Sequence, residues 1–342
     1  MITASPGSRQ QDGAGVAEAW QRELAQAVTE PGELLRLLGL DPTRVPHLTG
    51  AMAGLRLRVP RGFVRRMRRS DPFDPLLLQV LPDLRELIEQ PGFLADPLAE
   101  QQHQSAPGLL HKYSGRALLI STGACAVHCR YCFRREFPYQ QAAAEGGRWH
   151  AALAAIAADS TIEELILSGG DPLTLGTARL AQLTAELAGV PHLRRLRLHT
   201  RTPIVLPERV DAALSRWLAD LPWPCVIVLH CNHANEIDDA VRAAAQRLRA
   251  TGATLLNQSV LLAGINDSVA ALEALSQALF AAGVLPYYLH LLDRVRGSAH
   301  FEVPEQQAHA LMRQLAGRLP GYLVPRLARD APGSASKLVF GT

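Results

Sequence analysis

Lysine is nearly absent from this sequence. Its lysine and arginine residues number 35, and only Lys112 and Lys337 among them are lysines. A reaction that passes through a Schiff base with the protein needs a lysine amine. Any such reaction in this chain therefore has two candidate residues.

Three further features are missing. No apolar run reaches the length of a membrane-spanning helix, and residues 1–10 lack the basic-then-apolar order of a signal peptide. The net charge is only +3, which does not by itself indicate nucleic acid binding. We therefore expect a globular cytoplasmic protein with no membrane partner, and nucleic acid is not favoured as a partner.

The five cysteines are unevenly placed. Cys125, Cys129 and Cys132 form a C-x3-C-x2-C run soon after the apolar segment 117–121. Clustered cysteines in a reducing compartment indicate metal binding rather than a disulfide framework. Three thiolates can each bind one iron of a cubane cluster, which leaves the fourth iron open to a substrate or cofactor. The run therefore predicts a reactive iron–sulfur site.

Structural zinc is the alternative for this loop. It would need three cysteines and a histidine, but His128 adjoins Cys129 and is poorly placed to join it on one tetrahedral ion. No second C-x2-C pair exists to close such a site. We therefore favour the cluster. Cys225 and Cys231 flank an apolar run and are expected to be ordinary buried thiols.

From about residue 116 onward, apolar strand-like segments alternate with helical ones. This alternation predicts an α/β fold of parallel β/α units that curl into a partial (β/α)6 TIM-like barrel. The barrel is assigned to residues 101–300, with an N-terminal helical accessory region at 1–100 and a C-terminal helix and lysine segment at 301–342. The predicted strands are 117–121, 164–168, 196–200, 226–230, 255–260 and 286–291. The predicted helices of the barrel are 149–158, 179–188, 212–219, 240–250 and 269–281.

The carboxyl ends of barrel strands are where such folds gather their chemistry. Polar residues follow the predicted strands at these positions. We therefore expect them to face one site: Cys125, Asp171, Arg201, Asn232, His233 and Asp293.

The segment 56–69 is rich in arginine. We expect a helix with a solvated basic face, and the alternative is a docking surface for an acidic protein or nucleic acid. Phe63 is its only aromatic residue, so nucleic acid is the less favoured partner.

Two groups near the cysteine loop can contact ligands. Gly169 and Gly170 follow a predicted strand, where they would let the backbone approach a ligand, and Asp171 can accept from an ammonium. An ordinary tight turn is the alternative. Arg134, two residues beyond Cys132, presents a fork of donors that suits a carboxylate, although a surface arginine is common in a chain so rich in arginine.

Lys337 follows a run of small residues, 331–336, that leaves room for a bulky planar cofactor. We favour pyridoxal phosphate (PLP) on Lys337, and the alternative is an exposed lysine of the tail. The other lysine, Lys112, lies beside Tyr113 and near Arg116, which suggests a phosphate-binding group instead.

The cysteine loop, with Tyr131 before its third cysteine, resembles that of the radical S-adenosylmethionine (SAM) enzymes. In that family the open iron binds SAM, and one electron cleaves it to a 5'-deoxyadenosyl radical. Together with segments 201–207, 230–236, 257–262 and 330–337, the loop is similar to the lysine 2,3-aminomutase family, whose members are PLP-dependent radical SAM isomerases. The resemblance runs from about residue 55 to the end of the chain.

The resemblance implies a radical SAM barrel and a role for each matching residue. The implied contacts are a 4Fe–4S cluster on Cys125, Cys129 and Cys132, SAM on Gly169, Gly170 and Asp171, PLP on Lys337 with Tyr113, Arg116 and Gln258 at its ring or phosphate, the substrate carboxylate on Arg134, and the distal ammonium on Asp293 and Asp330.

Two acidic residues at the far end of the pocket favour lysine over glutamate as substrate, because a buried unpaired ammonium is costly. The implied reaction moves the α-amino group of L-lysine to Cβ, beginning with abstraction of a hydrogen from Cβ. The chain ends five residues after Lys337, without the zinc-binding extension of longer members. It thus resembles the short form that makes (R)-β-lysine for elongation factor P.

The expected partners are a reducing electron-donor protein, the elongation factor P modification system and a second copy of the chain in a homo-oligomer. Whether the substrate is free lysine or a protein-bound lysyl group stays open. A radical SAM enzyme that acts on another amino acid, or without PLP, is an alternative; without PLP it predicts no borohydride-trappable adduct on Lys337. A non-catalytic zinc or nucleic-acid-binding protein predicts colourless protein without iron.

Overall fold

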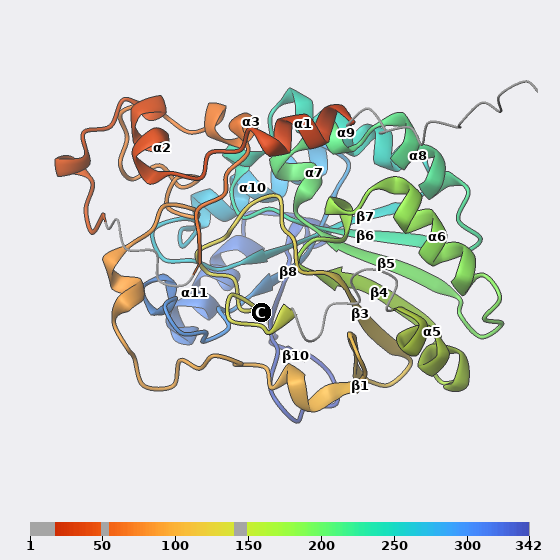
Figure 1. The fold of residues 1–342 in the computed structure, drawn as a ribbon. Helices are drawn as coiled ribbons and strands as arrows, with labels where there is room; N and C mark the ends of the chain where they lie inside the picture. The colour runs from red at the N-terminus through yellow and green to blue at the C-terminus, as the bar shows by residue number, and fades with distance from the viewer. Residues whose placement is uncertain (1–17, 49–54, 140–148, 342) are drawn as a thin grey trace, which may run out of the picture.

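The computed structural model describes residues 18–48, 55–139 and 149–341 (Figure 1). Residues 1–10, which lack the pattern of a signal peptide, and the last residue, 342, lie outside the described residues. Among the helices that the structure describes, none is long and apolar enough to cross a membrane.

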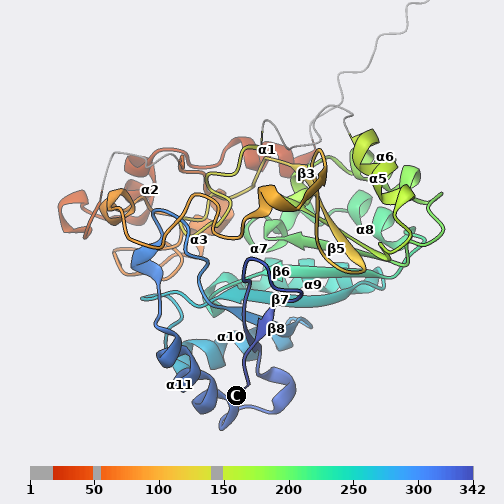
Figure 2. The same cartoon turned by 90° about the horizontal axis from the view of Figure 1, so that it is seen from below.

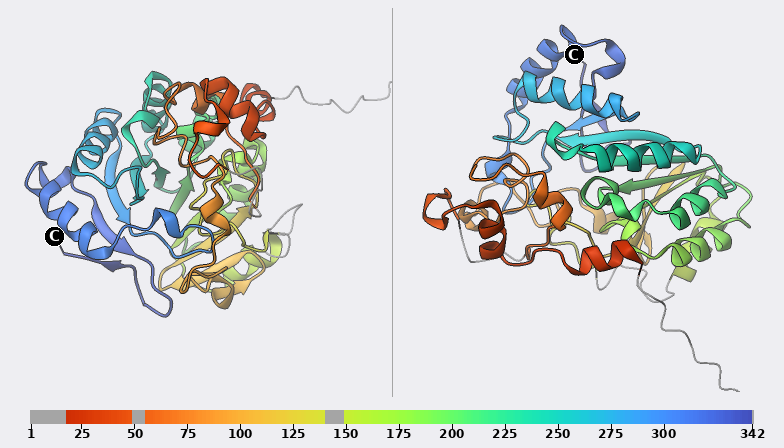
Figure 3. Two further views of the ribbon diagram at one scale, coloured as in Figure 1. Left: turned by 90° about the vertical axis from the view of Figure 1, so that its left-hand side faces the viewer. Right: turned by 90° about the horizontal axis from the view of Figure 1, so that it is seen from above.

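Within this part of the chain, ten strands form one sheet whose spatial order follows the sequence. The strands from β3 to β9 pair in parallel, while β1 and β2 at one edge and β10 at the other pair antiparallel. The sheet is curved, and its edge strands β1 and β10 do not pair with each other, so it forms an open, partial barrel (Figure 3). The strands are β1 (Gln104–Ala106), β2 (Leu109–Tyr113), β3 (Arg116–Thr122), β4 (Glu164–Gly169), β5 (Arg195–Thr200), β6 (Cys225–His230), β7 (Thr254–Val260), β8 (Leu285–His290), β9 (Arg326–Arg329) and β10 (Leu338–Val339).

Helices between the parallel strands cover the outer face of the sheet (Figures 1 and 3). Several begin at a side chain that accepts from the first-turn backbone: Asp211 from Leu214, Asp238 from Val241, and Ser268 from Ala271. These caps fix where each helix starts. The helices are α5 (Trp149–Ala158), α6 (Thr177–Leu187), α8 (Ala212–Ala219), α9 (Asp239–Ala250), α10 (Val269–Ala281) and α11 (Glu305–Ala316).

The six predicted strands and the five predicted barrel helices are confirmed, with ends displaced by two residues at most. Cys225 and Cys231 are buried, as expected. The sequence reading missed β9, which extends the parallel set by one strand, and the antiparallel strands at both edges. The division into three regions stays a prediction. The segment after residue 300 is joined to the barrel sheet through β8 and β9.

The N-terminal region packs against the carboxyl ends of the strands. It contains α1 (Ala19–Ala25), α2 (Pro31–Leu38) and α3 (Arg61–Arg65), and turns and short 3₁₀ segments follow up to His103, after which β1 begins. Its buried apolar side chains share one core with Ala126 and Val127 of the cysteine loop and with Val205 and Leu206 after β5 (Figures 1 and 2). The region therefore supports the loop that carries the cysteines.

The expectation of one helix over 56–69 is wrong, because only Arg61–Arg65 is helical. The expected solvated basic face is confirmed in part, since Arg56, Arg65, Arg68 and Arg69 are exposed. Some arginines of the segment also bind groups of the same chain. Arg66 is mostly buried, forms an ion pair with Asp238, and donates to the carbonyl of Glu236. Arg68 pairs with Asp71 and Asp74. Arg66 therefore links the N-terminal region to the barrel, whereas Arg68 pairs within the N-terminal region.

Candidate active site

A cavity of about 590 Å³ opens inside the curved sheet. This volume lies in the range of natural ligand sites. The cavity is lined at one end by the cysteine loop after β3 and at the other by the segment between β9 and β10. Every residue for which the resemblance implied a ligand contact lines it: Cys125, Cys129, Cys132, Arg134, Gly169, Gly170, Asp171, Tyr113, Arg116, Gln258, Asp293, Asp330 and Lys337. Arg201 lines it as well. The expectation that Asn232 and His233 face the same site is wrong, because Asn232 bonds to Gln79 and Tyr131 and His233 accepts from the Asn235 N–H.

The three cysteines are free thiols that are neither fully buried nor fully exposed. Burial and the neighbouring charge of Cys129 together raise the pKa of the Cys132 thiol to about 11. Burial and the charges of Cys132, Asp171 and Cys129 raise the pKa of Cys125. Ionisation of Cys125 and Cys132 is therefore favoured by a positively charged centre beside them, which the irons of a cluster would supply.

The arrangement differs from that of a single-ion site. In the described part of the chain, no three or more His, Cys, Asp or Glu side chains lie close enough together to hold one metal ion. A cubane cluster takes one thiolate per iron, so its ligands stand farther apart than those of one ion. His128 does not face the cysteines, because its Nδ1 bonds to the carbonyl of Arg56 at 2.7 Å. Three soft thiolates on a cavity wall fit the cluster.

The two glycines after β4 are required by the cysteine loop itself. Gly169 has φ +120°, and a Cβ there would lie 2.5 Å from the Thr122 carbonyl oxygen. A Cβ on Gly170 would lie 2.2 Å from the carbonyl oxygen of Ala124. The Gly170 N–H donates to the carbonyl oxygen of Thr122 at 2.7 Å. The close approach that the sequence predicted for a ligand is, in this structure, an approach of the loop backbone.

Asp171 also binds the chain itself. One of its oxygens accepts from Leu173 N–H and the Thr200 hydroxyl, and the other accepts from the N–H groups of Arg201 and Thr202. It therefore fixes the backbone at the end of β5, where the short helix α7 (Thr202–Val205) begins. Its side chain lines the cavity, but both carboxylate oxygens already have donors.

Arg134 is buried, and its donors are engaged. Its Nε and Nη2 donate to the two carboxylate oxygens of Glu100 at 2.7 and 2.6 Å. Its Nη1 donates to Ser168 Oγ and to the Gly169 carbonyl. Glu100 begins a 3₁₀ segment before β1 and was not predicted as a site residue. The guanidinium thus faces the cavity with a carboxylate of the chain on its fork.

At the other end of the cavity, Lys337 Nζ forms an ion pair with Asp330. The same carboxylate accepts from the Tyr113 hydroxyl at 2.5 Å, so β2 and the segment after β9 meet across the opening of the sheet. These contacts lower the pKa of Asp330 to about 2, with the charge of Lys337 as the largest lowering cause. Lys337 is therefore held at the cavity wall by an anion.

Asp293 follows β8 and faces the same end. Burial and the charge of Asp330 raise its pKa to about 7, against the lowering effect of Lys337. Two carboxylates, of Asp330 and Asp293, therefore lie near the single ammonium of Lys337 at this part of the cavity wall. Burial lowers the pKa of His290 to about 3, so that imidazole is neutral and offsets none of the negative charge.

Cations also gather at the hairpin of β2 and β3. The Arg116 guanidinium lies 4.7 Å from the ring centroid of Tyr113, and Lys112 Nζ lies 5.3 Å from it. Gln258 lies on β7 and faces the cavity. Cationic side chains, an aromatic ring and a lysine amine form a donor set that fits a planar phosphorylated aldehyde such as PLP.

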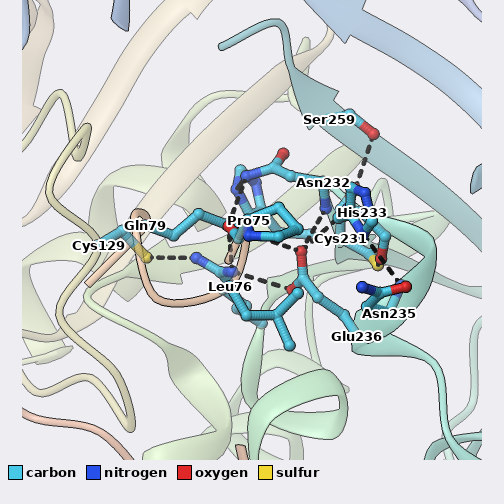
Figure 4. Close-up of polar contacts among 12 residues, drawn as sticks. Pro75, Leu76, Gln79, Cys129, Cys231, Asn232, His233, Asn235, Glu236 and Ser259 are labelled. Carbon is cyan, nitrogen blue, oxygen red and sulfur yellow. Dashed lines mark hydrogen bonds and ion pairs between the residues drawn. The ribbon is translucent and has the colours of Figure 1, made fainter. Parts of the chain in front are cut away.

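A buried polar network behind the cysteine loop was not predicted. Arg201 Nη1 donates to Cys129 Sγ at 2.8 Å and to Tyr131 Oη at 2.5 Å. Gln79, Asn232 and Glu236 converge on the same place (Figure 4). Arg201 and Asn232 stood out only as polar residues after strands. No sequence pattern marks Gln79 as part of the site, because its partner Arg201 is 122 residues away in the chain.

Comparison with known proteins decides the family. No family model matches the chain. The L-lysine 2,3-aminomutase of Escherichia coli K12 is 50% identical over 94% of this chain and 94% of that protein, and the L-lysine 2,3-aminomutase of Haemophilus influenzae is 44% identical over 94% and 95%. The chain belongs to the lysine 2,3-aminomutase family.

The resemblance drawn from the cysteine loop and the other segments is thus confirmed, and the protein is an enzyme of the isomerase class. The family implies a 4Fe–4S cluster and SAM. The L-lysine 2,3-aminomutase of Clostridium subterminale is a longer relative, 33% identical over 93% of this chain and 76% of that protein. A solved radical SAM methyltransferase from Sphaerobacter thermophilus is 19% identical, with a TM-score of 0.45 over 65% of this chain and 68% of that one.

Proposed function

We propose that this protein converts L-lysine to β-lysine by moving the α-amino group to Cβ, with a 4Fe–4S cluster, SAM and PLP. Relatives that share up to half of its residues carry the name of this activity. The observation that carries the proposal is that Cys125, Cys129 and Cys132 line the same cavity as Lys337. A radical formed at one end then reaches a substrate held at the other without leaving the protein.

Cys125, Cys129 and Cys132 would hold the cluster, and SAM would lie at its open iron beside Gly169 and Gly170. When bound, this pair supplies a carbon-centred radical that takes a hydrogen from Cβ of the substrate. The protein's own part is to enclose that position: the loop backbone packs on Gly169 and Gly170, and the N-terminal region covers the loop from outside.

Lys337 would hold PLP, with Lys112 and Arg116 as cations for its phosphate and Tyr113 and Gln258 beside it. When bound, PLP carries the migrating nitrogen while Cβ is a radical. Attachment of PLP to Lys337 would take the free ammonium of this lysine away from Asp330, with which it forms an ion pair in this structure.

The two acidic residues support lysine as the substrate. Asp330 and Asp293 lie near each other at the cavity wall, and two largely buried carboxylates favour a ligand that brings a cation. The distal ammonium of lysine supplies that charge. A substrate that ends in a carboxylate would add a third negative charge at the same place.

Arg134 would bind the substrate carboxylate, which must share or replace Glu100 on the guanidinium. A bidentate pair with carboxylate is the geometry that arginine favours, so the substrate carboxylate and Glu100 compete for one fork. We also place the enzyme in the cytoplasm, with a reducing protein as electron donor and elongation factor P modification as the use of the product. Formation of β-lysylated elongation factor P in a coupled assay tests that last assignment.

The proposal is tested with anaerobically reconstituted protein supplied with L-lysine, SAM and dithionite, with β-lysine measured by chromatography. Borohydride treatment is expected to fix PLP on the peptide that contains Lys337. Lys112→Arg should keep this adduct, and Lys337→Arg should lose both adduct and product. A preparation with full iron and PLP content that makes no β-lysine would contradict the proposal.

A further inference from the structure

Arg201 follows β5, lines the cavity and contacts the cysteine loop. Its Nη1 donates to Cys129 Sγ at 2.8 Å, and its Nη2 pairs with Glu236 at 2.9 Å and donates to Gln79 at 2.6 Å. The Arg201 and Glu236 side chains are 7% and 0% exposed. A charged donor held this way inside the protein is therefore fixed on one of the three thiols.

Several distant segments fix this guanidinium. Asp171 accepts from the Arg201 backbone N–H at 2.7 Å. Asn232 donates to Gln79 and to the Tyr131 hydroxyl, and Glu236 accepts from the backbone N–H groups of Asn232 and His233 (Figure 4). The donor is thus oriented by the ends of β4 and β6 and by the N-terminal region together.

We infer that Arg201 is a positioning residue that sets the reduction potential of the cluster through its hydrogen bond to Cys129. The inference rests on the cluster assigned to this loop under the proposed function. Hydrogen bonds to the cysteine sulfurs, together with the net charge nearby, are main determinants of the potential of iron–sulfur centres.

The sign follows from charge. Reduction adds one electron to the cluster, taking it from the 2+ to the 1+ state, and a buried cationic donor stabilises the state with more negative charge. Arg201 therefore raises the potential and makes reduction easier. The carboxylate of Glu236 partly offsets this, because it lies on the other side of the same guanidinium. Opposite substitutions should then move the potential in opposite directions.

The experiment is an EPR-monitored redox titration of reconstituted protein, with dithionite as reductant and iron and sulfide measured on each sample. Arg201→Gln removes the cation and is expected to lower the midpoint potential. Glu236→Gln removes the offsetting anion and is expected to raise it. Arg201→Lys keeps a charge without the fork, and its potential is expected between wild type and Arg201→Gln.

Arg209→Gln is the matched control. Arg209 is also fully buried and donates to the carbonyls of Leu173 and Leu175 rather than to a sulfur, so its loss should leave the potential at the wild-type value. Wild-type potentials in fully loaded Arg201→Gln and Glu236→Gln would overturn the inference. If Arg201→Gln takes up no iron, an unchanged potential in loaded Glu236→Gln overturns it alone. An iron-free wild-type protein would instead refute the proposed function.

Discussion

Glu100 occupies the guanidinium fork of Arg134 with two hydrogen bonds, of 2.7 and 2.6 Å. Both side chains are largely buried, at 12% and 6% exposure, so this pair is little screened by solvent. Because Arg134 is proposed to bind the substrate carboxylate, a carboxylate of the chain stands on the donors that the substrate needs.

Glu100→Gln should therefore strengthen substrate binding. The amide keeps the size of the side chain but is a weaker competitor for the guanidinium, since hydrogen bonds between two charged groups are the stronger ones. We expect the KM for lysine to fall by about tenfold, which corresponds to about 1.4 kcal/mol, with kcat little changed. Steady-state kinetics measure this. A KM that rises instead would mean that Glu100 positions Arg134 and does not compete with substrate.

Asp293→Asn should weaken lysine binding, because a buried ammonium loses one charged partner. The expected rise in KM is about 10- to 100-fold, from the loss of about 1.5–3 kcal/mol for a hydrogen bond to a charged group. Asp239→Asn is the control, since Asp239 lies on the surface of α9 with its side chain 99% exposed. Equal KM values for wild type and Asp293→Asn would show that Asp293 does not bind the substrate ammonium.

The KM for lysine should also depend on pH. Burial and Asp330 raise the pKa of Asp293 to about 7, so below pH 7 this carboxyl is protonated and pairs poorly with an ammonium. KM should fall as the pH rises through about 7. His290, whose pKa is lowered to about 3 chiefly by burial, does not titrate in this range. Asp293→Asn should flatten the profile, and an unflattened profile in that variant would assign the titration to another group.

The raised pKa of Asp293 also affects the free energy of unfolding. A rise in pH favours substrate binding but lowers stability. Between the ordinary value of 3.8 and about 7, the folded chain binds a proton at Asp293 that the unfolded chain has released. This residue therefore reduces stability as the pH rises through that window. The melting temperature of Asp293→Asn should therefore vary less with pH between 3.8 and about 7 than the melting temperature of wild type.

Gly170→Ala should disrupt the cysteine loop. The new Cβ would meet the Ala124 carbonyl oxygen at 2.2 Å, so the loop must shift, at a cost of about 1–3 kcal/mol. Both the melting temperature and the iron bound per chain are expected to fall. Gly189→Ala is the control, because nothing lies within 4 Å of the Cβ position there. Normal iron loading in Gly170→Ala would show that the loop has room to adjust.

The sequence predicts the parallel strands well because their patterns are typical of strands. Every residue of β4 is buried, and in β5 and β7 buried residues alternate with less buried ones. The sequence does not reveal β9, because Arg326-Leu-Ala-Arg329 is a short segment with a charged residue at each end. The cysteines and Lys337 are recognisable from spacing and scarcity. Glu100 and Gln79 are not, since each acts through a partner far along the chain, Arg134 and Arg201. Local patterns carry no information on such pairs.

The fate of the α-nitrogen tests the central claim most directly. L-lysine labelled with ¹⁵N only at the α-amino group is incubated with reconstituted protein, SAM, PLP and dithionite, and the product is examined by NMR. Migration within one cavity predicts β-lysine with the label bonded to Cβ. Label that stays on Cα, in protein that carries a full cluster and cleaves SAM, would contradict the account.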